Sequence, residues 1–140
     1  MDTLNIMNTA GMVSLATVLG GMVFFAFIAT PMVFSQLPAE TSGPFIRKLF
    51  PVYSQVMGGL SLMAALLLWN HPEAIPLGIV FLLFLYGWLV LMPKINRYRD
   101  AQLAGHKEAK PKFNLLHKFS VVINSLQLTT VGVVFVRLVL

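Results

Sequence analysis

Four long apolar stretches, separated by hydrophilic loops, dominate the chain. They cover residues 12–34, 52–69, 76–92 and 119–136, and none contains an acidic, basic or histidine side chain. About 20 mostly apolar residues, with a range of ~17–25, span the hydrocarbon core of a bilayer. The pattern therefore predicts an all-α integral membrane protein whose four transmembrane helices form an antiparallel bundle.

The segments between these stretches predict where the helices end. Residues 70–73, Asn-His-Pro-Glu, are typical of a tight turn, so helices two and three should be antiparallel neighbours. Pro51 suits the first turn of helix two, and Pro31 is expected to kink helix one. Residues 96–104 are compatible with a solvated helical extension that ends at Gly105. The predicted single domain of residues 1–140 has helices at about 9–36, 51–70, 75–94 and 114–138, and basic loops at 37–50 and 95–113.

Composition agrees with a membrane environment. Hydrophobic residues make up 57% of the chain and charged residues 11%, with a mean hydropathy of +0.79, which is more apolar than one soluble core requires. The chain has no cysteine, which excludes disulfides, thiolate metal sites and cysteine nucleophiles. The first apolar stretch is full length and lacks a basic region before it, so we expect a retained helix rather than a signal peptide.

The basic residues are distributed unevenly among the loops. Only Arg137 lies on the side of the second loop. The other nine lie in or beside loops one and three: Arg47, Lys48, Lys94, Arg97, Arg99, Lys107, Lys110, Lys112 and Lys118. Because short cytoplasmic loops retain Lys and Arg, we expect these loops in the cytoplasm and both termini on the opposite side of a bacterial inner membrane.

The same basic loops contain the candidate contacts for anionic lipid headgroups, each basic residue contributing about 1 kcal/mol. If the protein transports a solute, the same residues would form the cytoplasmic mouth of the transport path: Arg47, Lys48, Asn96, Arg99, Asp100 and Lys118. Arg99 and Asp100 are expected either to pair locally or to dock against His117 and the first loop. Nucleic acid is not expected as a partner, because the basic residues are juxtamembrane and mixed with acidic ones.

Small residues mark one face of each of the first two helices. Membrane helices associate through close backbone approach at small residues, and residues three or four apart share a face. The pattern predicts that helix one packs on helix two through Ser14, Thr17, Gly21, Ser54, Gly58 and Ser61.

A polar stripe enters the bilayer on helix four. At 100° per residue, His117, Ser120, Asn124 and Gln127 lie within an arc of about 80°. Polar groups in hydrocarbon need partners, for which Thr30, Tyr53, Ser54 and Gln55 are candidates. The stripe is either an interhelical hydrogen-bond network, worth about 0.6–2 kcal/mol per bond, or a site for a ligand or ion.

Three sequence segments resemble the transmembrane-protein-205-like family. They are residues 24–53 (FFAFIATPMVFSQLPAETSGPFIRKLFPVY), 96–100 (NRYRD) and 116–124 (LHKFSVVIN). The resemblance covers nearly the whole chain, although Tyr53-Ser54 departs from the aromatic pair expected there. It implies four helices in a membrane, and the family has no settled biochemical function.

Three functional hypotheses follow. No nucleophile with a base, no Gly-rich phosphate loop and no paired carboxylates stand in a membrane stretch, so an enzyme is not expected. The leading hypothesis is a non-enzymatic accessory or scaffolding subunit that binds other membrane subunits or a second copy. The alternative is a small oligomeric channel or transporter lined by the stripe. The third is haem or metal binding through His117; because one histidine does not make a site, no metal and no cofactor other than bound lipid is predicted.

Overall fold

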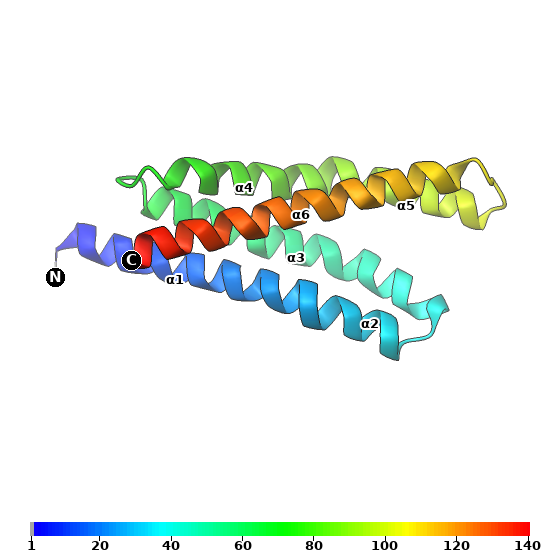
Figure 1. The fold of residues 1–140 in the computed structure, drawn as a ribbon, viewed down its shortest axis with the longest axis horizontal. Helices are drawn as coiled ribbons and strands as arrows, with labels where there is room; N and C mark the ends of the chain where they lie inside the picture. Colours follow the sequence, from blue (N-terminus) through cyan, green and yellow to red (C-terminus); the bar gives the residue numbers. More distant parts are fainter. Residues whose placement is uncertain (1) are drawn as a thin grey trace.

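The computed structural model describes residues 2–140, which form four long helices in an antiparallel bundle with both chain ends at the same end (Figure 1). Each helix is long and apolar enough to cross a membrane, and the described residues contain no strand. This confirms the prediction of an all-α protein with four helices that are long and apolar enough to span a membrane. The first spanning helix comprises α1 (Thr3–Phe24), the π-helical turn η1 (Phe25–Ala29) and α2 (Thr30–Gln36); the second is α3 (Ala39–Leu67); the third comprises α4 (Ala74–Tyr86), η2 (Gly87–Leu91) and α5 (Met92–Leu103); the fourth is α6 (Ala109–Val139).

Most helix ends lie beyond the predicted bounds, although α3 ends at Leu67 rather than near residue 70, so most of the expected basic loops 37–50 and 95–113 are helical. The first spanning helix begins at Thr3 rather than near residue 9, because the Asp2 carboxylate accepts a hydrogen bond from the Asn5 amide at 2.9 Å and caps it. α3 begins directly after Pro38, and α6 includes Pro111 in its first turn. Proline is tolerated there because the first amides of a helix have no partner within it.

Two of the prolines inside the spanning helices are accommodated in the same way. Pro31 and Pro93 each follow a π-helical turn, in which the Thr30 amide bonds to the Phe25 carbonyl and the Met92 amide to the Gly87 carbonyl. A π turn is a recognised cause of a local bend, so the expected kink at Pro31 takes this form. Pro51 lies within α3 rather than in its first turn as predicted.

The end of α5 is fixed by a glycine. Gly105 has φ 97°, and the chain reverses through bonds from the Gly105 amide to the Gln102 carbonyl (3.1 Å) and from the His106 amide to the Ala101 carbonyl (3.0 Å). This pairing is the Schellman arrangement, which requires a left-handed residue after the helix. The helical extension predicted up to Gly105 is therefore present, and only residues 104–108 connect the third and fourth spanning helices.

α3 lies at the centre of the packing, against α1 on one side and α4 on the other, and α6 packs against both α1 and α4. The most buried side chains come from all four spanning helices: Leu15, Val18, Met22, Ala64, Leu68, Leu77, Val80 and Val131. α1 and α3 approach closely at Gly11, where an added Cβ would lie 2.7 Å from Leu68 Cγ and 3.2 Å from Leu67 Cβ. The position therefore requires glycine.

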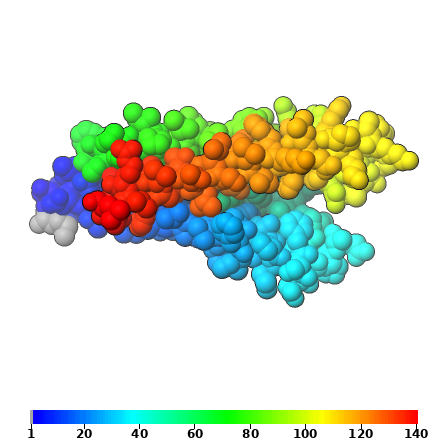
Figure 2. All heavy atoms as spheres, in the orientation of Figure 1, coloured from blue at the N-terminus to red at the C-terminus, as the bar shows by residue number. Residues whose placement is uncertain are grey.

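Beyond an aromatic cluster, the bundle opens. Phe25 stacks on Tyr53 with ring centroids 3.9 Å apart, and Phe50 and Phe84 contact the same tyrosine edge-on or tilted. From there α2 diverges from α5 and α6 toward the end opposite the termini (Figure 1). The space-filling view is hollowed between α2 and α6 (Figure 2). We call this opening, between α2 and the first half of α6, the wedge.

Enlarging Gly11 should separate α1 from α3. We expect Gly11→Leu to destabilise the folded protein by about 1–3 kcal/mol, because the new side chain overlaps the buried Leu68. Gly20→Leu is the matched control, since nothing lies within 4 Å of a Cβ at that position. Thermal unfolding of both variants in mild detergent measures the difference, and equal midpoints would show that α1 does not pack as described.

Candidate functional site

The polar stripe of α6 is divided between the bundle interior and the surface. Gln127 is buried, and its Nε2 donates to the carbonyl oxygen of Val80 in α4 at 3.2 Å. Its partner is thus a backbone group, not one of the four side chains expected from the sequence. The bond ties the fourth spanning helix to the third.

The other three stripe residues do not join Gln127 in a shared cavity. His117 is exposed and its ring lies parallel to that of Phe113, at 5.9 Å. The Ser120 hydroxyl donates to the His117 carbonyl at 2.7 Å, within α6 itself. Asn124 is half-buried and its amide makes no hydrogen bond within residues 2–140. No three His, Asp or Glu side chains in this part of the chain are close enough to hold a metal ion together.

Helical periodicity gives the direction in which Asn124 lies. Gln127 and Arg137 contact α4 and the turn before it, on one side of α6. By the 100° rule, Asn124 lies within about 40° of Leu128 and Phe135, which pack on the core, and about 60° from Gln127. Asn124 is nearer the basic end than Leu128 and Phe135, where α2 has moved away. Asn124 therefore lies at the level of α6 where the wedge begins.

The basic end is held together by contacts between α3, α5 and α6. Arg47 Nη2 donates to an Asp100 carboxylate oxygen at 2.8 Å and to the Asn96 carbonyl at 3.1 Å. Of the arrangements expected for Asp100, docking against the predicted first loop is formed through Arg47, whereas the expected contact with His117 is not found within residues 2–140.

Two cation–π contacts join α5 to α6 in opposite directions. The Arg99 guanidinium lies 5.4 Å from the Phe113 ring centre, and Lys112 Nζ lies 5.6 Å from that of Tyr98. Two other candidate headgroup contacts, Lys48 and Lys118, are exposed.

The small residues predicted to join helices one and two serve more than one neighbour. Ser14, Ser54 and Ser61 are buried, and a Cβ on Gly21 would meet Met57 of α3 at 2.7 Å. Gly58 instead faces Phe84 of α4, with an added Cβ at 3.1 Å. Thr17 is exposed and its hydroxyl bonds to its own helix, so it does not contribute to the predicted packing.

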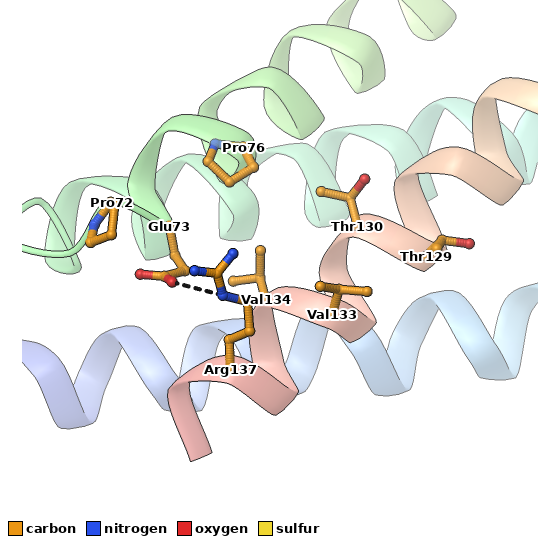
Figure 3. A pocket seen from close by; sticks show the side chains of 8 residues that line it. All are labelled: Pro72, Glu73, Pro76, Thr129, Thr130, Val133, Val134 and Arg137. Carbon is orange, nitrogen blue, oxygen red and sulfur yellow. Dashed lines mark ion pairs between the residues drawn. The ribbon is translucent and has the colours of Figure 1, made fainter. Parts of the chain in front are cut away.

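An ion pair at the other end of the bundle was not predicted. Glu73, in the turn before α4, is 8% exposed, and its Oε1 lies 3.4 Å from Nε of Arg137 in the last turn of α6. The two residues line a pocket of about 380 Å³ between α4 and α6 (Figure 3). The signal in the sequence was that Arg137 is the one basic residue placed on the same side as this turn.

These features define the class of protein: a bundle of four helices that are long and apolar enough to cross a membrane, with one strongly basic end. The chain belongs to the family described as Domain of unknown function (DUF4149), whose model matches residues 13–103. The match ends with α5, so the polar stripe and Arg137 lie outside it. No curated protein and no solved structure matches the chain. The family carries no assigned function, and its description does not mention the transmembrane-protein-205-like family.

Replacing Gln127 should weaken the contact between α6 and α4. We expect Gln127→Leu to lower the free energy of unfolding by about 0.6 kcal/mol, and at most ~1.7 kcal/mol, as for other interhelical hydrogen bonds in membranes. Ser125→Ala is the control, because the exposed Ser125 hydroxyl bonds only to the Val121 carbonyl of its own helix. Detergent-based thermal unfolding compares the two, and a larger loss in the Ser125 variant would contradict the assignment.

Proposed function

We propose that the protein is a non-enzymatic accessory subunit that docks laterally on a larger membrane assembly, with the wedge as its contact surface. The observation that carries this proposal is the position of Asn124. A carboxamide side chain lies part-way along a helix that is long and apolar enough to cross a membrane, at the level where the wedge begins, without a hydrogen-bond partner within residues 2–140.

The physical argument is that hydrocarbon offers no hydrogen bonds. Polar side chains within a bilayer bond to other helices or face water. The hydroxyls of Ser125, Thr129 and Thr130 satisfy this requirement by bonding to carbonyls one turn earlier in α6. The Asn124 amide has donors and an acceptor to offer, and the wedge gives a second protein access to them. The proposed partner is a transmembrane helix with one polar side chain.

The channel hypothesis has less support from the geometry. A conducting path needs polar groups that are free to exchange with a passing solute. The Gln127 amide is instead occupied by a backbone carbonyl, and the Ser120 hydroxyl by its own helix. His117 stacks on Phe113 at the surface, which likewise gives no support to haem or metal binding as a function.

The proposal includes an orientation and a membrane. The nine basic residues of loops one and three favour a cytoplasmic position for the end bearing residues 104–108, in a bacterial inner membrane, with anionic lipids around it. The resemblance of residues 24–53 to the transmembrane-protein-205-like family agrees with a small membrane protein of this kind, and we retain it as a proposal.

Partner binding should depend on Asn124. We expect Asn124→Leu to weaken association roughly threefold to twentyfold, which corresponds to one interhelical hydrogen bond, while leaving thermal stability unchanged. The matched control is Ser125→Leu, the same kind of change on the adjacent residue, about 100° away around the helix.

The measurement is extraction from the native membrane in very mild detergent, followed by native separation and identification of what migrates with the protein. Comigration with a stoichiometric partner that Asn124→Leu reduces and Ser125→Leu does not supports the proposal. A lone monomer or a homo-oligomer that conducts solute through Asn124 would refute it in favour of a channel.

The orientation can be tested with single cysteines, because the chain has none of its own. We expect Lys107→Cys, in the basic loop, to be protected from a membrane-impermeant maleimide in intact cells. Asn70→Cys, in the turn at the opposite end, should be labelled under the same conditions. Both positions are exposed, so the comparison reports sidedness alone. The reverse labelling pattern would invert the proposed topology.

A further inference from the structure

The pocket between α4 and α6 is a second candidate site, at the opposite end from the basic loops. Its volume is about 380 Å³, and Glu73 and Arg137 stand at one end of it (Figure 3). Pro76 of α4 and Thr130, Val133 and Val134 of α6 form its other walls. The lining therefore changes from charged to uncharged and mostly apolar along the pocket.

The direction of this change matches the depth profile of a bilayer. Arg137 is in the last turn of α6, and Thr130 lies about two turns nearer the middle of that helix. Two turns of helix rise about 11 Å, which is enough to pass from the headgroup region into the acyl chains. An occupant of this pocket thus has a polar part at the level of the ion pair and an apolar part beside Val133.

The pocket contains one negative and one positive side chain, Glu73 and Arg137, and neither has all of its hydrogen-bonding groups paired. The Glu73 side chain is 10% exposed and has one contact, its Oε1 to Nε of Arg137 at 3.4 Å. The two terminal nitrogens of Arg137 make no hydrogen bond or ion pair within residues 2–140, and the side chain is 67% exposed. The Glu73 carboxylate can therefore accept further hydrogen bonds, and the terminal nitrogens of Arg137 beside it can still donate them.

We propose that this pocket binds a zwitterionic phospholipid whose headgroup carries a primary ammonium, of the phosphatidylethanolamine type. The ammonium donates to the Glu73 carboxylate, the phosphate accepts from the terminal nitrogens of Arg137, and an acyl chain lies against Val133 and Val134. Arginine binds phosphate through paired N–H donors, and a buried carboxylate favours a donor that it can bond directly. An anionic headgroup places no cation opposite Glu73, and a quaternary ammonium has no N–H to donate.

The test uses purified, delipidated full-length protein in a mild detergent, titrated with phosphatidylethanolamine, phosphatidylcholine or phosphatidylglycerol of identical acyl chains. Native mass spectrometry counts bound lipid, and thermal unfolding measures the stabilisation. We expect the ethanolamine lipid to bind about tenfold more tightly than the choline lipid, a difference of about 1.4 kcal/mol. Equal binding of these two lipids by the unaltered protein would overturn the proposal.

Three variants separate lipid recognition from a purely structural ion pair. Glu73→Gln should reduce binding of the ethanolamine lipid to the level of the choline lipid, whereas Glu40→Gln, an exposed acid at the far end, should change neither. Val133→Trp keeps the ion pair but fills the pocket from an exposed position, so it should abolish the stabilisation by either zwitterionic lipid. Retention of the ethanolamine preference in Glu73→Gln, or in Val133→Trp if the first variant does not fold, would show that the pair serves folding alone.

Discussion

The lack of hydrogen-bonding solvent in a bilayer is the constraint on which the rest of this structure depends. Every backbone amide and carbonyl of a spanning segment has to be satisfied within the chain, so four apolar stretches become four nearly uninterrupted helices. Proline is the residue that tests this rule. Pro38, Pro76 and Pro111 stand before or within the first turn of a helix, where no partner is lost. Pro31 and Pro93 follow π turns that redirect the local bonds.

The same constraint sorts the polar side chains. The hydroxyls of three residues donate to carbonyls one turn earlier and need no partner on a neighbouring helix: Ser14, Ser61 and Thr130. Gln127 is too long for that solution and reaches the Val80 carbonyl across the bundle instead. Asn124 lies about 60° away around α6 and makes no hydrogen bond within residues 2–140. Two neighbouring carboxamides on one helix therefore differ in whether the fold satisfies them.

The sequence predicted what depends on local pattern and failed where spatial neighbours decide. The four spans follow from the length of the apolar stretches. The extension ends at Gly105 because the left-handed backbone position after a helix favours glycine. The starts of α3 and α6 were missed because a proline reads equally as a breaker or as a first-turn residue. Gly58 was assigned to the wrong neighbour because a face of small residues does not say which helix covers it. The partner of Gln127 was missed because every residue has a backbone carbonyl, so the residue types do not indicate which one accepts the bond.

The two charged ends of the bundle contribute differently to the fold. Arg47 and Asp100 are exposed by 38% and 61% at their side chains, and exposed pairs of this kind contribute about 0–1 kcal/mol. This ion pair therefore adds little to the stability of the bundle, although it joins α3 to α5. The Glu73 side chain is 10% exposed and that of Arg137 is 67% exposed, so this pair is more shielded from water on one side than the pair at the basic end. The pair joins the last turn of α6 to the turn before α4, which are far apart in the sequence.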